Sequence, residues 1–389
     1  MSASQVSTGH NVSVSRATAE IDLGAIAANI EHLRAVAPDS LLQAVVKADA
    51  YGHGTVPVAR AARSAGADYL GVAFPSEAVA LRGAGDTGPL MCWLYSPDEN
   101  LASCAAADVE ISVSSVSMLD QVTAAAQQAD SRVGVHLKLD SGLGRNGSTP
   151  KEWEVLVREA KRRQDEGRIE VIGVWSHLAC ADDPESPATQ QQIRVFSQGL
   201  AVAADMGVQP RLRHLAATAG TLAFPESHFD MVRCGIGIYG LSPGMGLGSA
   251  ADLGLRPAMT VRARVAMAKV VEAGHGVSYG HTYRTSADTR LALVPVGYGD
   301  GIPRAGSGSL PVHIRGKRYI VAGTIAMDQF VIDVGDNSVE AGDMVELFGT
   351  GAAGAATADE WAGDSGTIGY EIVTRLGARI PRHYVGVEQ

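Results

Sequence analysis

Short apolar runs alternate with longer alanine-rich stretches along the first two thirds of the chain. The runs are typical of buried strands, and the stretches between them carry apolar residues at helical spacing. The predicted strands are 42–47, 69–74, 90–95, 110–114, 133–139, 171–177, 212–216 and 231–239. Helices are predicted between them, among others over 23–37, 56–65, 76–84, 153–166 and 189–206. About eight alternations over roughly 230 residues favour an α/β fold with a closed parallel (β/α)8 barrel, and an open doubly wound sheet is the alternative.

The pattern changes near Arg256. From there the apolar runs are short, β-branched and separated by Gly, Pro or Asp, which predicts an antiparallel β domain. Its predicted strands are 260–271, 291–296, 312–314, 320–322 and 330–334, and its helices are 357–361 and 370–376. Thr357 and Glu360 have the spacing of a capping box at the start of the first helix. We therefore predict a barrel domain over 1–254, which includes a polar tail, and a β domain over 255–389, with glycine-rich 244–254 as the linker.

Composition narrows the class of protein. The chain has 389 residues, 46% of them hydrophobic, which suits a globular protein with two domains. A net charge of −10 argues against a nucleic-acid partner. The four cysteines are scattered without the paired spacing of a zinc or redox site, so we predict free thiols and no metal site. We find neither a signal peptide nor a stretch that could span a membrane, and we expect a cytoplasmic protein.

The first predicted strand ends on a lysine, Lys47, in the segment AVVKADAYGHG. A buried ammonium is costly unless it is paired or used chemically. Tyr51 and the glycines at 52 and 54 follow, where the chain turns tightly and can approach a ligand. Taken alone, the segment favours a lysine whose head group reaches solvent, whereas its surroundings favour a chemical role.

Polar residues stand at the ends of the later predicted strands of the barrel. They are Arg145, His177, Thr218, Arg233 and Gly235. Barrel enzymes place catalysis at the carboxyl ends of their strands and often bind a phosphate after strands seven and eight. There the Thr218 hydroxyl and the turn at Gly235 and Ile236 offer donors for an anion. A lysine facing a phosphate site suits pyridoxal 5′-phosphate, which needs an amine, a phosphate cradle and a partner for its ring nitrogen. Arg233 is the candidate partner.

Two glycine patterns offer a different interpretation. Residues 142–147 (GLGRNG) and 235–240 (GIGIYG) both match G-x-G-x-x-G, which is typical of dinucleotide sites. Such a site requires the glycines to open a helix directly after a strand. The first pattern runs into Ser148 and Pro150, and the second is itself apolar and strand-like. An NAD-dependent oxidoreductase is therefore the alternative enzyme class, on a weak signal.

A series of segments resembles the alanine racemase family, in the same order, from about Arg16 onward. They are VVKADAYGHG, HLKLDSGLGRNG, WSHLACAD, FDMVRCGIGIYG, HGVSYGHTY, GYGDGIPR, IAMDQF and IGYEIVTRLGARIPR. The resemblance implies a barrel that binds pyridoxal 5′-phosphate, a C-terminal β domain, and a head-to-tail homodimer whose partner completes each active site. It also implies interconversion of L-alanine and D-alanine, with D-alanine supplied for peptidoglycan.

The resemblance implies roles for particular residues as well. Lys47 resembles the Schiff-base lysine and one of two acid/base groups, and Tyr279 of the partner subunit resembles the other. The cofactor phosphate is assigned to Tyr51, Thr218, Gly235, Ile236 and Tyr370. Arg233 resembles the partner of the ring nitrogen, with His177 between it and Tyr279.

For the substrate, Arg145, the Met327 backbone and Asp328 resemble its binding groups, and Tyr298 resembles a residue of the channel through which it enters. In part of the family, a lysine seven positions before the arginine is carbamylated, and Lys138 has that spacing from Arg145.

The proposed chemistry sets requirements on these groups. Lysine and tyrosine both have ordinary pKa values of about 10, so each pKa must shift toward neutrality for the group to act as a base. A hydrogen-bonded chain from Tyr279 through His177 to Arg233 would favour the phenolate. The Arg233 guanidinium keeps its proton, which leaves the ring nitrogen largely unprotonated and should suppress transamination.

The chain departs from the family pattern in two places, a pair of residues and a single residue. Ala217 and Thr218 stand where the family usually has Asn-Ser, and Cys234 stands where proline is common. Both changes border the cofactor, so a racemase for serine or another small amino acid is the nearest alternative to an alanine enzyme.

Overall fold

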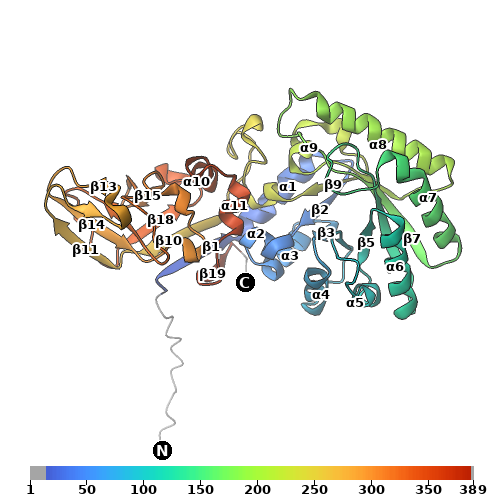
Figure 1. Cartoon of the computed structure of the whole chain (residues 1–389), viewed down its shortest axis with the longest axis horizontal. Coiled ribbons are helices and arrows are strands. Elements are labelled where there is room, and N and C mark those ends of the chain that lie inside the picture. Colours follow the sequence, from blue (N-terminus) through green and yellow to red (C-terminus); the bar gives the residue numbers. More distant parts are fainter. Residues whose placement is uncertain (1–14, 387–389) are drawn as a thin grey trace, which may run out of the picture.

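The predicted barrel is present in the computed structural model, which describes residues 15–386 (Figure 1). Its eight strands run parallel in the order β9-β2-β3-β4-β5-β6-β7-β8. They are β2 (Leu41–Val45), β3 (Tyr69–Val72), β4 (Leu90–Cys92), β5 (Glu110–Val113), β6 (Val133–Lys138), β7 (Ile169–Trp175), β8 (Leu212–His214) and β9 (Met231–Cys234). A parallel bridge between Ala217 and Arg233 joins the end of β8 to β9. The sheet is therefore closed, and the open doubly wound alternative is wrong.

Helices cover the outside of the barrel, as Figure 1 shows. They are α1 (Leu23–Val36), α3 (Thr55–Ser64), α4 (Pro75–Gly83), α5 (Ala102–Ala106), α6 (Val116–Gln128), α7 (Pro150–Asp165), α8 (Pro187–Asp205) and α9 (Thr218–Ala223). Helix α1 illustrates the sequence rules: Asp22 caps it by accepting a hydrogen bond of 3.0 Å from Ala25 N, and its buried side includes Ile26, Ile30 and Leu33.

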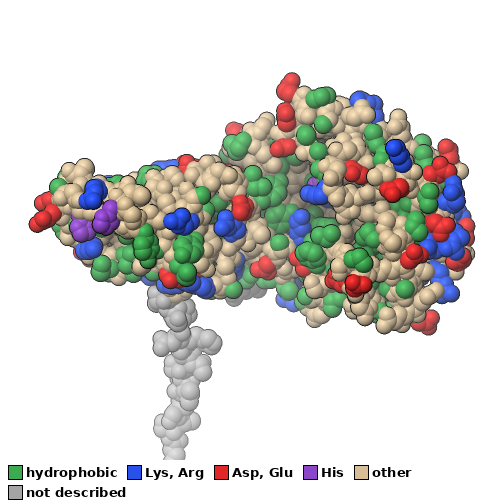
Figure 2. All heavy atoms as spheres, in the orientation of Figure 1, with side chains coloured by type: hydrophobic (Ala, Val, Ile, Leu, Met, Phe, Trp, Pro, Cys, Tyr) green, Lys and Arg blue, Asp and Glu red, His purple; other side chains and the backbone are tan. Residues whose placement is uncertain are grey.

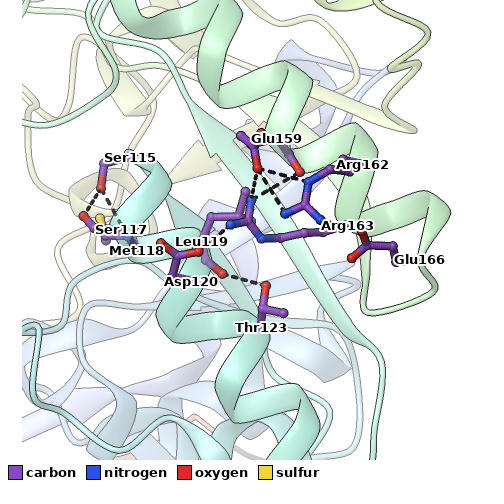
Figure 3. A network of polar contacts seen from close by, with 10 residues as sticks. All are labelled: Ser115, Ser117, Met118, Leu119, Asp120, Thr123, Glu159, Arg162, Arg163 and Glu166. Atoms are coloured by element: carbon purple, nitrogen blue, oxygen red, sulfur yellow. Dashed lines mark hydrogen bonds and ion pairs between the residues drawn. The ribbon is translucent and has the colours of Figure 1, made fainter.

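Adjacent helices are also joined by charge, and Figure 3 shows the clearest case. Arg163 on α7 is buried, and its Nη1 lies 3.0 Å from the Glu159 carboxylate one turn earlier. Its Nη2 donates to Asp120 on α6, so one guanidinium links two helices.

The remaining strands form the β lobe, defined here as β1, β10–β19, α10 (Ala358–Ser365) and α11 (Gly369–Thr374). A six-stranded sheet has the order β16-β15-β18-β10-β1-β19, and smaller sheets are β11-β14-β17 and β12-β13. Only β1 and β19 pair in parallel in these sheets, so the prediction of a mainly antiparallel domain is confirmed. The strands are β1 (Ala17–Asp22), β10 (Met259–Arg264), β11 (Met267–Val271), β12 (Gly276–Val277), β13 (Tyr283–Arg284), β14 (Thr289–Val294), β15 (Pro311–Ile314), β16 (Lys317–Ile320), β17 (Phe330–Asp333), β18 (Met344–Phe348) and β19 (Arg382–Val385).

Three predicted strands differ clearly from the structure. The predicted strand 320–322 shares only Ile320 with β16 (Lys317–Ile320). The predicted strand 231–239 ends at Cys234, and the 3-10 helix η2 (Ile236–Tyr239) follows. Every residue of this apolar run is buried, and periodicity does not separate a buried strand from a buried helix. The predicted strand 260–271 is two strands, β10 and β11, in different sheets.

One half of the predicted capping box is present at the start of α10, where Thr357 Oγ1 accepts a hydrogen bond of 3.2 Å from Glu360 N.

The two lobes lie side by side along the long axis of the molecule, with α11 near their junction (Figure 1). Helix α11 packs closely on the segment after β2: a Cβ at Gly52 would lie 2.3 Å from the Val373 carbonyl oxygen. Hydrophobic side chains also reach the surface around this junction (Figure 2). Within residues 15–386, no helix has the length and apolar character needed to cross a membrane.

Candidate functional site

The polar residues singled out in the sequence lie at one end of the barrel, which we call the barrel mouth. Lys47, predicted as the last residue of a strand, lies two residues beyond the end of β2 and begins α2, and Lys138 is the last residue of β6. His177 and Thr218 follow β7 and β8, and Arg233 lies within β9. Because all eight strands are parallel, their carboxyl ends share this end of the barrel. The predicted convergence of these residues on one site is therefore present.

Lys47 begins a single left-handed turn, α2 (Lys47–Gly52). Four consecutive non-glycine residues, Ala48 to Tyr51, adopt the left-handed helical conformation, with φ between 51° and 54°. This conformation costs roughly 1–2 kcal/mol for each such residue. Hydrogen bonds hold the turn in place: Glu77 Oε1 accepts from Ala48 N at 2.6 Å, and Asp49 Oδ1 accepts from Thr55 N at 3.0 Å. Strain of this kind is concentrated at functional sites, and the sequence pattern did not reveal it.

The turn gives Lys47 aromatic surroundings. Its Nζ lies 5.9 Å from the centre of the Tyr51 ring and 5.8 Å from that of Trp93. Burial and the Arg145 guanidinium lower the pKa of Lys47, and the Glu77 carboxylate opposes the shift. A lysine with a lowered pKa supplies a neutral amine, which is the nucleophilic form.

A set of donors suited to an anion lies beside β8 and β9. Thr218 Oγ1 accepts hydrogen bonds from Gly235 N at 3.1 Å and Gly237 N at 3.3 Å, so its own proton is free to be donated. Ile236 N opens η2 and donates to no residue within 15–386.

Two tyrosines complete this set of donors. The Tyr51 hydroxyl closely approaches Gly235, since a Cβ there would lie 2.5 Å from it. The Tyr370 ring lies 6.1 Å from the Tyr51 ring. Burial raises the pKa of both tyrosines, which keeps their hydroxyls protonated as donors.

Arg233 is held by a nearly complete set of acceptors. Its Nη2 donates to Ser176 O at 2.8 Å and to Leu215 O at 3.0 Å, and it lies 3.2 Å from His177 Nδ1, so two N–H groups face three acceptors. Burial lowers the pKa of Arg233 to about 9, so it remains charged at neutral pH. Among residues 15–386, its Nε has no hydrogen-bond partner, which leaves that donor available to a ligand.

Sequence reasoning missed a buried chain of polar groups behind Arg233. Arg233 Nη1 lies 3.3 Å from His214 Nδ1, and His214 Nε2 lies 3.0 Å from His136 Nδ1. His136 Nε2 lies 2.7 Å from Glu110 Oε2. Trp175 stacks on His214 with ring centres 5.6 Å apart. Alternate strand residues point into a barrel, so polar residues within the apolar strands were the available signal.

Lys138 and Arg145 lie on the other side of the mouth. Lys138 is 3% exposed, with Nζ 4.1 Å from the centre of the Trp175 ring. Burial, Arg233 and Arg145 lower its pKa to about 7, so this lysine is largely uncharged above neutral pH. Arg145 is exposed, on a loop where Asp140 Oδ1 accepts from Gly142 N at 2.9 Å.

The remaining predicted residues lie on the β lobe and are exposed: Tyr279, Tyr298, Met327 and Asp328. They gather around the segment 324–328, where Thr324 Oγ1 donates to Tyr279 O at 3.0 Å and Tyr298 N donates to Ala326 O at 3.1 Å. In the described part of the chain, no hydrogen bond joins these four residues to the barrel mouth. Within one described chain, the two sets of residues are therefore not connected by hydrogen bonds.

The barrel mouth fits pyridoxal 5′-phosphate. Lys47 would supply the amine, and Thr218, Ile236 and Tyr51 would offer donors for a phosphate. The Nε of Arg233, which has no partner within residues 15–386, would supply a donor for the ring nitrogen. A glycine at 235 is required because a side chain there would meet the Tyr51 hydroxyl.

Two family models match the chain over almost its whole length. The model described as "Alanine racemase, N-terminal domain" matches residues 21–243, and "Alanine racemase, C-terminal domain" matches residues 258–384. A curated alanine racemase from Frankia casuarinae is 51% identical over 370 residues, covering 95% of this chain and 96% of that protein. One from Streptomyces coelicolor is 51% identical over 377 residues, covering 96% of each. The solved structure of the alanine racemase of D-cycloserine-producing Streptomyces lavendulae superposes with a TM-score of 0.95, at 52% identity, covering 96% of this chain and 98% of that chain.

Proposed function

This chain belongs to the alanine racemase family, and on that premise we propose that it interconverts L-alanine and D-alanine with pyridoxal 5′-phosphate as cofactor. The observation that carries the proposal is the position of Lys47, a lysine of lowered pKa at the same barrel mouth as a set of phosphate donors. We propose that D-alanine made here supplies peptidoglycan synthesis and that the protein is cytoplasmic.

When bound, the cofactor would supply an aldehyde that attaches covalently to an amine and an electron-withdrawing ring that acidifies the α-carbon. Lys47 would hold the cofactor by its ε-amino group. The hydroxyls of Tyr51, Thr218 and Tyr370 and the backbone at Gly235 and Ile236 would bind the phosphate. Arg233 Nε would donate to the ring nitrogen, which keeps that nitrogen unprotonated because the guanidinium holds its own proton.

Racemisation needs one proton carrier on each face of the α-carbon. We assign Lys47 Nζ to one face and Tyr279 Oη of the partner subunit to the other. The support for Lys47 is its lowered pKa. The support for Tyr279 comes from His177: its Nδ1 accepts from Arg233, so in the neutral ring Nε2–H is free to donate to a phenolate. Burial and Arg233 hold the pKa of His177 well below its usual value, which keeps the ring neutral.

The substrate carboxylate would be held by Arg145 and by the backbone N–H of Met327 with Asp328. Tyr298 would line the approach to the site. We propose that Lys138 is carbamylated and braces Arg145, since a buried lysine with a pKa of about 7 supplies the neutral amine that carbon dioxide requires.

The site would be completed in a homodimer, because the substrate groups of the β lobe are exposed and, within residues 15–386, form no hydrogen bond to the barrel mouth. Tyr279 is 73% exposed and Met327 is 53% exposed, which is unusual for side chains of this size. Other large apolar side chains exposed on the β lobe are Met267, Val270, Ile320, Met344 and Ile368. We propose that the partner subunit covers part of this exposed apolar surface.

We retain the division into a barrel domain over 1–254 and a β domain over 255–389 as part of the proposal. It is supported by the two matched ranges, which leave residues 244–257 between them. Strand β1 lies in the sheet of the β lobe although it precedes the barrel in the chain.

The test is to follow D-alanine formation from L-alanine with purified protein, alongside serine and other small amino acids. We expect alanine to be the preferred substrate and Lys47→Ala to be inactive. A preference for serine would favour the alternative, a racemase specialised for another small amino acid. That alternative is motivated by Ala217, the N-cap residue of α9, whose side chain forms no capping hydrogen bond.

A second experiment tests the two faces. In deuterated water, Tyr279→Phe should exchange the α-proton of only one alanine enantiomer while retaining the cofactor. Exchange of both enantiomers at the wild-type rate would remove Tyr279 from catalysis.

A further inference from the structure

A buried carboxylate, Asp300, lies beside the β-lobe residues assigned to the substrate. Its side chain is completely buried, and its Oδ1 lies 2.6 Å from Arg16 Nη2 and 3.0 Å from Arg379 Nε. Its Oδ2 accepts a hydrogen bond of 3.0 Å from Gly297 N. Asp300 is therefore fully paired, and it anchors the guanidinium of Arg379 at the surface.

Arg379 also pairs with a second carboxylate. Its Nη2 lies 2.7 Å from Asp328 Oδ1, so one guanidinium bridges buried Asp300 and exposed Asp328. The planar, forked head group allows both contacts at once, which a lysine ammonium reproduces poorly. The side chain of Asp328 is 61% exposed and has no other hydrogen bond within residues 15–386. Its direction therefore depends on Arg379.

Backbone hydrogen bonds also join the turn that contains Asp300 to the segment 326–328. The turn η5 (Tyr298–Asp300) donates from Tyr298 N to Ala326 O at 3.1 Å and from Gly299 N to Met327 O at 2.8 Å. A Cβ at Gly297 would lie 2.2 Å from the Ala326 carbonyl, so these two segments lie in direct contact. A shift of η5 would therefore move the segment that carries Met327 and Asp328.

We propose that Arg379 and Asp300 are positioning residues that hold Met327 and Asp328 in the geometry required by the active site of the partner subunit. The inference rests on the proposed function, in which that segment binds substrate across a dimer. Neither residue is assigned a contact with substrate or cofactor. Arg379 lies in the segment GARIPR and Asp300 in the segment GYGDGIPR. The family resemblance described above implies no role for either residue.

The first test compares Arg379→Ala with a matched control, Arg318→Ala. Arg318 is similarly exposed on the β lobe and forms one ion pair, with Glu360, away from the segment 326–328. Because misplacement of a binding group by about 1 Å can cost a hundredfold, we expect kcat/KM of Arg379→Ala to fall by roughly tenfold to a hundredfold, with a raised KM for alanine. Its melting temperature and the cofactor absorption should match those of Arg318→Ala, since Arg16 and Gly297 still pair Asp300. Unchanged kcat/KM would overturn the proposal.

Conservative variants sharpen this result. Arg379→Lys keeps the charge but not both contacts, so its KM should lie nearer to that of the alanine variant than to wild type. If charge alone restores the wild-type KM, the bridging geometry is not what matters and the proposal is wrong. Asp300→Asn removes the charge that pairs with Arg379 and gives a second test. We expect a raised KM for alanine with unchanged cofactor absorption, and an unchanged KM would count against the role of Asp300.

The decisive test uses heterodimers isolated with two affinity tags. In a dimer of Lys47→Ala with Arg379→Ala, one site combines an intact Lys47 with an intact segment 326–328 from the other protomer. If each symmetric site takes one part from each protomer, this dimer should show the wild-type KM and about half the wild-type kcat. A KM as high as in the Arg379→Ala homodimer would mean that Arg379 acts within its own chain, which overturns the proposal.

A control heterodimer of Lys47→Ala with Tyr279→Phe separates the two hypotheses. Restored activity in this control supports the shared site independently of Arg379. If the control stays inactive, the shared site fails and this inference fails with it. If the control is restored while the Arg379 heterodimer is not, only the inference about Arg379 and Asp300 is wrong.

Discussion

Replacing Gly235 with alanine would place a methyl group 2.5 Å from the Tyr51 hydroxyl oxygen. Gly235 has φ of −102°, outside the left-handed region, so the cost of the substitution comes from this contact. The Tyr51 ring does not swing away freely, because it packs against Tyr239 at 4.8 Å and Tyr370 at 6.1 Å. Relief requires a shift of about 1 Å, and overpacking of this kind costs roughly 1–3 kcal/mol of folding free energy.

The same shift would move a phosphate donor, so the affinity for pyridoxal 5′-phosphate should fall by about tenfold or more, at 1.4 kcal/mol for each tenfold. The assays are urea unfolding of the cofactor-free protein and titration of that protein with the cofactor. Gly363→Ala in α10 is the matched control, since a Cβ there meets nothing within 4 Å. It should be neutral or slightly stabilising.

A second substitution identifies the contact. Tyr51→Phe removes the hydroxyl oxygen, and the nearest atom to the new methyl group is then Cζ at 3.2 Å. Gly235→Ala should therefore lower the free energy of unfolding by at least about 1 kcal/mol less in the Tyr51→Phe background than in wild type. An equal cost in both backgrounds would refute the reasoning, because the hydroxyl would not be what the methyl group meets.

Three further predictions concern charged groups. Arg233→Glu should allow the ring nitrogen to be protonated and so increase cofactor loss by half-transamination, measured as pyruvate released per D-alanine formed; an unchanged ratio would rule this out. In buffer free of carbon dioxide, Lys138→Met should melt at a higher temperature than wild type at pH 6. At that pH the folded wild type must bury a charged ammonium, whose pKa burial lowers to about 7, and the methionine variant avoids this cost. The unfolded lysine binds its proton up to about pH 10, so this advantage should shrink as pH rises from 7 to 10, and added bicarbonate should stabilise only the wild type. A constant difference across that range would contradict the pKa argument. Arg163→Ala should destabilise the fold by about 1–2 kcal/mol, because it breaks the link between α6 and α7, without changing KM; a raised KM would show that this distant link affects the site.

Strand positions were predictable because each barrel strand is a short apolar run between helical stretches. For the same reason, the polar residues at the ends of those runs converged as expected on one mouth. Strand boundaries were wrong where every residue is buried and no polar face marks the period. Residues 231–239 are all buried, so the change from β9 to η2 at Gly235 left no periodic signal. The place of β1 beside β10 depends on pairing between distant segments, which periodicity does not report.

The site was predictable only as far as one chain contains it. Lys47 was identified from its segment, but its left-handed turn depends on Glu77, which lies in a different helix. The contact between His214 and His136 joins strands β8 and β6, which are separated by β7 in the sheet, so it depends on the barrel fold rather than on any local motif. The roles of Tyr279 and Asp328 came from family resemblance, and they stay predictions because a second protomer is needed to test them.

The central claim is that Lys47 is the residue that bears the cofactor. Purified protein reconstituted with pyridoxal 5′-phosphate would be reduced with borohydride, digested and analysed by mass spectrometry. The account predicts a phosphopyridoxyl group on the peptide that contains Lys47, and loss of the visible absorption band. A phosphopyridoxyl group on another lysine, or none on any peptide, would contradict it.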